Sequence, residues 1–120
     1  MDDCIFCKIV AGDLPSEEIA HTERVIAIRD INPAAPVHLL VIPRDHIPGI
    51  AEIAAAPEGL LDELFGLANE VADKEGVGDS GYRLVFNNGP DSGMLVPHLH
   101  LHVLGGAPLG PIASAGAGRG

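Results

Sequence analysis

Between residues 58 and 75, apolar side chains recur at steps of three and four, which places them on one face of a helix. Pro57 suits the first turn of such a helix, and Gly76 suits its exit. The pattern therefore predicts a long amphipathic helix with an apolar face made of Leu60, Leu61, Leu64, Phe65, Ala68, Val71 and Ala72.

Five short stretches rich in β-branched and other apolar residues predict strands. The clearest covers residues 37–42 and lies between Pro36 and Pro43, which cannot donate to a sheet ladder and so fit the strand ends. The others cover residues 19–21, 25–28, 82–87 and 98–104, and a turn at residues 22–24 joins the first two. Residues 5–12 predict a short helix that Gly12 and Pro15 end.

Strands precede and follow the long helix without a regular strand-helix alternation. This order favours an α+β domain with a mainly antiparallel five-stranded sheet, one long helix and a short N-terminal helix. The length of 120 residues fits one domain, which we expect at residues 1–112. Because residues 105–120 are rich in Gly, Ala, Pro and Ser and lack periodicity, we expect a loosely held end, with residues 113–120 as a flexible tail.

The formal charge is −10, from 7 Lys and Arg against 17 Asp and Glu, and it argues against a nucleic acid partner. A small nucleotide stays compatible with this charge, because a few local donors can hold it. No apolar run approaches the roughly 20 residues of a membrane span. The first four residues are acidic and lack the layout of a signal peptide. We therefore expect a cytoplasmic protein without a membrane partner.

Cys4 and Cys7 are the two cysteines of the chain and form a single C-x-x-C motif. In a reducing compartment this spacing favours metal or redox chemistry over a structural disulfide. Two residues do not complete a zinc site, which takes four nitrogen or sulfur ligands. A thioredoxin-like dithiol remains an alternative, although no βαβ pattern follows the motif.

Three histidines, His98, His100 and His102, alternate with apolar residues. On a strand their rings would share one face at a spacing of about 6.6 Å. Chance predicts this pattern roughly 0.015 times in a chain with six histidines, so chance does not explain it. Three interpretations stay open: a solvated face on an edge strand, a metal site that uses all three rings, and nucleophilic catalysis by a neutral imidazole. Catalysis requires one ring nitrogen to be free while the other donates to a fixed acceptor.

Residues 98–104 resemble the signature of the histidine triad (HIT) family, in which His-x-His-x-His precedes apolar residues. The resemblance covers about residues 4–112 and includes further blocks at residues 4–10, 30–33 and 38–46. Within the family, Asn87 and the segment 104–111 resemble the bacterial Hint-like branch, whereas the branch of dinucleoside polyphosphate hydrolases typically has Gln at the position of Asn87.

Histidine triad proteins are nucleotide hydrolases and transferases that act on the α-phosphate of nucleoside monophosphate conjugates. The resemblance implies that His100 is the nucleophile and forms a nucleotidyl-histidine that water hydrolyses. It also implies that His102 contacts the phosphate and moves a proton, and that His38 relays charge toward the nucleophile. For the Hint-like branch, the implied substrates are purine nucleoside phosphoramidates and aminoacyl-adenylates.

The resemblance further implies a nucleotide site in which Asp30 holds the ribose hydroxyls, a bidentate role that a carboxylate suits. The implied lining of the base pocket is Ile5, Phe6, Ile9, Ile28 and Ile31, and core packing is at least as good an interpretation of each. The expected nucleotide-binding set is completed by Asn87, Gly93, Val96, His100 and His102.

The loop before the histidine run departs from the family pattern. Met94 stands where Gln is usual, and Leu95 stands where many Hint proteins have Ser. Backbone N–H groups of this loop can still meet phosphate oxygens, but a side-chain hydroxyl to the leaving group is lost. These departures keep open a nucleotide-binding regulatory module with little catalysis. A dinucleoside polyphosphate hydrolase is the other alternative.

Some bacterial histidine triad proteins combine the C-x-x-C motif with two histidines to bind structural zinc. The resemblance thereby implies a zinc site of Cys4, Cys7, His46 and His98, which has no open position for catalysis. His21 has no matching role and is expected at the surface. The family forms homodimers by joining two sheets, so the resemblance also implies a homodimer.

Overall fold

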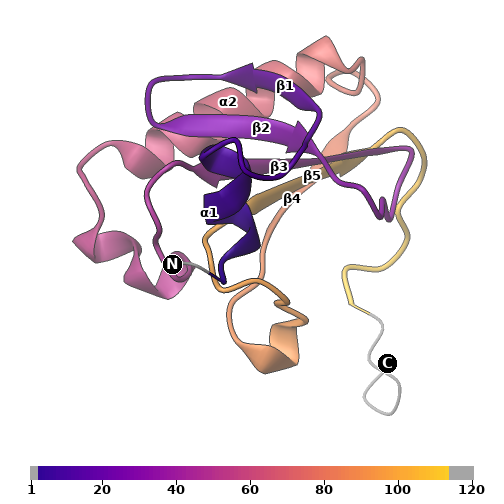
Figure 1. Ribbon diagram of the computed structural model, residues 1–120. Coiled ribbons are helices and arrows are strands. Elements are labelled where there is room, and N and C mark those ends of the chain that lie inside the picture. The colour runs from indigo at the N-terminus through magenta and orange to yellow at the C-terminus, as the bar shows by residue number, and fades with distance from the viewer. Residues whose placement is uncertain (1–2, 114–120) are drawn as a thin grey trace.

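The computed structural model describes residues 3–113 and shows one five-stranded sheet with helices on both faces (Figure 1). The strand order is β1-β2-β3-β5-β4, and every neighbouring pair is antiparallel. The strands are β1 Glu18–His21, β2 Val25–Arg29, β3 Val37–Pro43, β4 Tyr82–Phe86 and β5 Leu101–Gly105. The helices are α1 Ile5–Val10 and α2 Leu60–Lys74, with short 3₁₀ helices η1 Ile50–Ala55 and η2 Pro90–Ser92. The predicted α+β class and antiparallel five-stranded sheet are confirmed.

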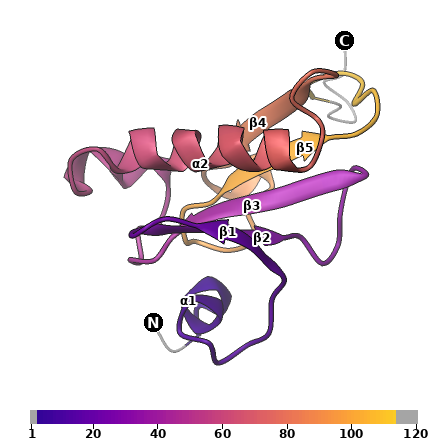
Figure 2. The ribbon, with the colours of Figure 1, turned by 90° about the horizontal axis from the view of Figure 1, so that it is seen from above.

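The sheet separates two apolar clusters, because α2 lies on one face and α1 on the other (Figure 2). Side chains of the central strands alternate between these clusters. The strand residues on the α2 side include Val25, Ala27, Leu39 and Val41. Those on the α1 side are Ile26, Ile28, Leu40 and Ile42, which pack with Cys4 and Phe6. Burial on both faces explains why β2 and β3 are continuous apolar runs in the sequence.

Helix α2 begins at Leu60, two residues later than the prediction, because Gly59 has a φ of +84° and lies in the left-handed region. Pro57 therefore lies in the turn before the helix, where its carbonyl accepts a hydrogen bond from the Leu60 N–H at 3.2 Å. The buried face follows the predicted period, but the prediction missed one of its members, Leu67. That face consists of Leu60, Leu64, Leu67, Ala68, Val71 and Ala72.

Strand β5 begins at Leu101, so the predicted strand at 98–104 is wrong at its start. His98 and His100 precede the hydrogen-bonded ladder, and only His102 lies within it. The alternation persists along this extended segment, because the α2-side core contains Leu99, Leu101 and Val103. Since β5 lies between β3 and β4, the interpretation as an edge strand with a solvated histidine face is also wrong.

The remaining boundaries differ by one to a few residues. Helix α1 ends at Val10, two residues before the predicted end, because Gly12 takes a φ of +85° in the turn that follows. Gly105 belongs to β5, and the Gly110 carbonyl accepts a hydrogen bond from Arg83 Nη2 at 2.9 Å, so the start of the expected loose end is held. The predicted tail at 113–120 lies outside the described residues except for residue 113. Within residues 3–113, no helix is long and apolar enough to cross a membrane.

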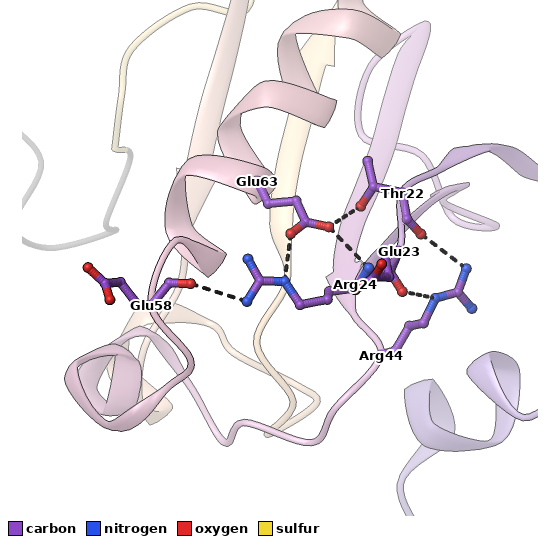
Figure 3. Close-up of polar contacts among 6 residues, drawn as sticks. All are labelled: Thr22, Glu23, Arg24, Arg44, Glu58 and Glu63. Atoms are coloured by element: carbon purple, nitrogen blue, oxygen red, sulfur yellow. Dashed lines mark hydrogen bonds and ion pairs between the residues drawn. The ribbon is translucent and has the colours of Figure 1, made fainter.

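A polar network joins the β1–β2 turn to α2 (Figure 3). The Glu63 carboxylate accepts hydrogen bonds from the Thr22 hydroxyl, from the Arg24 N–H at 3.0 Å and from Arg24 Nε at 2.7 Å. Arg24 Nη1 also donates to the Glu58 carbonyl at 3.2 Å. Arg44 Nη2 donates to the Thr22 carbonyl at 3.4 Å, which links the end of β3 to the same turn. The network therefore fixes the hairpin against α2, on the side of the sheet opposite α1.

Candidate active site and metal centre

A cavity of about 510 Å³ lies between α1, the end of β2, the middle of β3 and the loop before β5. The sequence placed eleven residues at a nucleotide site, and all eleven line this cavity: Ile5, Phe6, Ile9, Ile28, Asp30, Ile31, Asn87, Gly93, Val96, His100 and His102. The cavity is also lined by Leu95, which the sequence placed near the leaving group, and by residues that the sequence did not predict: Leu14, Pro15, Ser16, Arg29 and Leu40. The alternation of β3 could have identified Leu40, which shares a face with Ile42.

One ring nitrogen of His100 is engaged in a hydrogen bond to the backbone. Its Nδ1 lies 2.7 Å from the His98 carbonyl oxygen, which can only accept, so Nδ1 carries the proton. Burial lowers the pKa of His100, which keeps the ring neutral at pH 7. The ring packs against the edge of Phe6 with centroids 4.9 Å apart. Nε2 is consequently an unprotonated nitrogen on a residue that lines the cavity.

A chain of hydrogen bonds through His38 places the proton of His102 on Nε2, whereas the proton of His100 is on Nδ1. The Ala34 N–H donates to His38 Nδ1 at 3.0 Å, so the neutral His38 ring carries its proton on Nε2. That nitrogen lies 2.9 Å from His102 Nδ1, which must then accept. His102 Nε2 therefore bears a proton. Asn87 Nδ2 lies 3.5 Å from this nitrogen, and a flip of the Asn87 amide by about 180° places its oxygen there to accept the proton. The site thus contains a lone pair on His100 Nε2 and an N–H on His102 Nε2.

Burial is the main effect that keeps His38 and His102 neutral. Burial, followed by the nearby His100 and His38 rings, lowers the pKa of His102 to about 4. Burial also lowers the pKa of His38, against the opposing effect of Asp30. Both rings therefore stay uncharged over the neutral pH range, as the proton assignment above requires.

Asp30 is part of the same cavity. Its Oδ1 accepts a hydrogen bond from the Asn32 N–H at 2.8 Å, and its Oδ2 lies 3.4 Å from His38 Nε2. Asp30, His38 and His102 lie close enough to share a cation. However, the only lone pair of the neutral His38 ring already accepts from Ala34, so this trio does not suit a metal.

Cys4, Cys7, His46 and His98 form a second group whose ligand atoms all lie within 4.8 Å of one another. Cys4 Sγ lies 3.3 Å from His98 Nδ1, and Cys7 Sγ lies 3.3 Å from His46 Nδ1 and 3.5 Å from His98 Nδ1. Tetrahedral zinc, with bonds of about 2.3 Å to sulfur and 2.0 Å to nitrogen, would separate sulfur and nitrogen by about 3.5 Å. The donor set and its spacing therefore fit a four-coordinate metal ion.

His98 is oriented for this group rather than for the cavity. Its Nε2 lies 2.9 Å from the Pro43 carbonyl, so the proton sits on Nε2 and Nδ1 is left as a ligand atom. Among the described residues, His100 belongs to no group that could hold a metal, so the three rings of the run do not form one metal site. His21 lies at the surface, as expected, and its Nδ1 pairs with Glu18 at 2.9 Å.

Comparison with known proteins gives one consistent family. A model of the HIT domain matches residues 11–109. The purine nucleoside phosphoramidase of Escherichia coli (strain K12) is 40% identical over 111 residues, which cover 92% of this chain and 93% of that protein. A HIT family hydrolase from Clostridium thermocellum superposes with a TM-score of 0.88 at 48% identity, covering 92% of this chain and 96% of that one. A histidine triad protein from Clostridium difficile superposes with a TM-score of 0.86 at 36% identity, covering 94% and 98%. The chain therefore belongs to the HIT domain family.

Proposed function

We propose that this chain, a nucleotide hydrolase of the HIT family, cleaves nucleoside monophosphate conjugates at the α-phosphate through a nucleotidyl-His100 intermediate. The observation that carries the proposal is the 2.7 Å contact between His100 Nδ1 and the His98 carbonyl, which leaves Nε2 of a neutral ring as the nucleophile. His102, with its proton on Nε2, is the complementary donor in the same cavity.

In the first half of the reaction, His100 Nε2 attacks the α-phosphorus and the bond from phosphorus to the leaving group breaks. The electron pair of that bond goes to the leaving nitrogen of a phosphoramidate. This nitrogen accepts the proton that His102 Nε2 donates. His102 Nε2 is then free to accept a proton in the second half. The charge that develops on His100 is stabilised by the bond from Nδ1 to the His98 carbonyl.

In the second half, water attacks the same phosphorus, and the bond to His100 Nε2 breaks. The electron pair returns to His100 Nε2, the nucleoside monophosphate leaves, and the proton lost by water goes to His102 Nε2, which restores the resting form of both rings. His38 acts through His102, because its Nε2–H keeps His102 Nδ1 as an acceptor and so keeps the His102 proton on the side of the substrate.

The rest of the cavity provides the nucleotide subsites. Asp30 accepts hydrogen bonds from the ribose hydroxyls, a role that its Oδ2 can take at the cavity lining. The purine lies against the aliphatic wall and Phe6, since the wall is apolar and contains few aromatic rings. Support for a purine conjugate comes from the 40% identity to the purine nucleoside phosphoramidase of Escherichia coli.

The direct test is turnover of adenosine 5′-phosphoramidate by wild type, His100→Ala and, as a matched control, His21→Ala. We expect His100→Ala to lose at least about 10³-fold in kcat, because a missing nucleophile leaves only binding effects. The control should retain wild-type kcat, because His21 is exposed and does not line the cavity. Substantial turnover by His100→Ala would contradict the proposal.

A substrate panel tests the finer assignment. Leu95, 92% exposed at the cavity, offers an apolar contact but no hydroxyl to a leaving group. We expect phosphoramidates and aminoacyl-adenylates to be cleaved faster than dinucleoside polyphosphates. Faster cleavage of the polyphosphates would favour the other branch, and AMP-dependent thermal stabilisation without turnover would favour a regulatory module.

We also propose that Cys4, Cys7, His46 and His98 bind one structural zinc ion. Support comes from the sulfur-nitrogen separations and from the His98 proton, which Pro43 holds away from the ligand cluster. When bound, zinc would cross-link α1 to the segment before β5. Metal analysis should find one zinc per chain, and a Cys7→Ser chain should lose it; a metal-free wild type of unchanged stability would contradict this assignment.

We also propose that the protein forms a homodimer and lies in the cytoplasm. The resemblance to the family supports a homodimer, and β4, an edge strand of the sheet within residues 3–113, offers a side for joining two sheets. Light scattering on the purified chain should give twice the monomer mass. A cytoplasmic location is supported by Cys4 and Cys7, which are free thiols at metal-ligand spacing rather than a disulfide.

A further inference from the structure

The nucleophile is not held by the sheet. His100 lies one residue before β5, so the ladder that fixes His102 does not fix His100. Other contacts hold this segment: the Leu99 N–H donates to the Ile47 carbonyl at 2.6 Å, and the His98 N–H donates to the Val96 carbonyl at 2.9 Å. The place of His100 therefore depends on its neighbours in the loop.

His98 makes the decisive contacts of that loop, and each of its parts has a different partner. Its ring is fully buried, with Nδ1 toward Cys4 and Cys7 and Nε2 bonded to the Pro43 carbonyl. Its backbone carbonyl accepts the Nδ1 proton of His100 at 2.7 Å. One residue thus connects the ligand cluster and the end of β3 directly to the tautomer of the nucleophile.

Helix α1 reinforces this connection from the other side. The Cys4 thiol caps α1 by accepting from the Cys7 N–H at 3.3 Å, so both thiols are fixed by the same turn of helix. Phe6, between them in sequence, packs its ring edge-on against His98 and His100, with centroids 5.9 Å and 4.9 Å away. A displaced His98 ring would therefore disturb His100 through both its carbonyl and Phe6.

We propose that His98 is a positioning residue for His100, and that the group Cys4, Cys7, His46 and His98 sets the tautomer of the nucleophile as well as stabilising the fold. The inference rests on the proposed function of His100 as nucleophile, but the tautomer itself can be measured without turnover. Loss of one ligand that does not line the cavity should free the His98 ring, tilt its carbonyl and allow His100 to place its proton on Nε2, where it blocks attack.

The test compares zinc-loaded wild type with His46→Asn, and uses His21→Asn as the matched control. His46 contacts Cys7 but does not line the cavity, so its substitution leaves the nucleotide contacts intact. Long-range ¹H–¹⁵N spectra of the histidine rings report which nitrogen of His100 carries the proton. In wild type and the control we expect a single form protonated at Nδ1. In His46→Asn we expect a mixture with the Nε2–H form and a kcat about 10- to 100-fold lower.

Removal of zinc from the wild-type chain by a chelator, followed by zinc addition, provides a second perturbation that needs no substitution. The tautomer mixture should appear on removal and disappear on addition. The proposal is overturned if zinc is lost while His100 stays protonated only at Nδ1 and kcat stays within about twofold of the control. A tautomer change in a chain that never hydrolyses a phosphoramidate would support the positioning by His98 and refute the proposed function instead.

Discussion

We predict that the hydrogen bonds of Glu63 contribute to the stability of the fold and not to catalysis. Glu63→Ala removes the carboxylate that joins the β1–β2 turn to α2 (Figure 3). Neither Glu63 nor its partners Thr22 and Arg24 line the cavity. We therefore expect the substitution to lower stability while leaving the kinetic constants at 25 °C unchanged.

The magnitude follows from three hydrogen bonds and their exposure. The ion pair with Arg24 Nε has side chains 34% and 20% exposed, so solvent screening reduces it to about 0.5–1 kcal/mol. The bonds from the Thr22 hydroxyl and the Arg24 N–H contribute about 1 kcal/mol each. The free energy of unfolding should fall by about 2–3 kcal/mol, which lowers Tm by about 10 °C for a domain of this size.

The assay is thermal and denaturant unfolding of Glu63→Ala beside Glu70→Ala, an exposed glutamate on the same helix that shares the change in helix propensity. Hydrogen bonds from Thr22 and Arg24 lower the pKa of Glu63 below its ordinary value. Its stabilisation is therefore complete above pH 4.5 and is lost as pH falls through the lowered pKa. A Tm equal to that of Glu70→Ala at pH 7, or a gap that widens toward pH 3, would refute the reasoning.

Three further predictions concern the site. Because burial lowers the pKa of His102 to about 4 and the chemistry needs neutral rings, kcat/KM at pH 5.5 should stay within about threefold of its value at pH 7; an ordinary histidine of pKa 6.5 would cost about tenfold. Asp30→Asn should raise KM for a purine phosphoramidate by about 10- to 100-fold with little change in kcat, whereas a 2′,3′-dideoxyribose substrate, which lacks both hydroxyls, should show no such rise. His38→Ala should lower kcat by about 100-fold in steady-state assays, because His102 Nδ1 loses the donor that keeps its proton on Nε2.

The sheet was predictable because its central strands are apolar on both faces and bounded by proline or turn residues. Local backbone geometry was less accessible. The sequence around Gly59 is compatible with either a helix or a turn. Only the φ of +84° at Gly59 shows that α2 begins after it. Likewise, the alternation from His98 to Val103 is typical of a strand, yet the ladder requires a partner, and β3 reaches β5 only from Leu101 onward.

The lining of the cavity followed from the resemblance to the HIT family, and the proton positions did not. The tautomers of His38 and His100 depend on the Ala34 N–H and the His98 carbonyl, which are backbone groups with no signature in side-chain type. The role of Pro43 is similar, because any residue at that position would offer the same carbonyl to His98. These details need the fold, since they arise from segments that only the sheet brings together.

The central claim is that His100 Nε2 becomes covalently bonded to the α-phosphorus. Incubation with adenosine 5′-phosphoramidate, a quench in alkali and intact mass measurement test it directly, because phosphohistidine survives alkali. The account predicts a mass increase of one adenylyl group (AMP less one water) during turnover, mapped to His100 and absent from His100→Ala. Turnover at the wild-type rate without any such adduct, or an adduct that maps to His102, would contradict it.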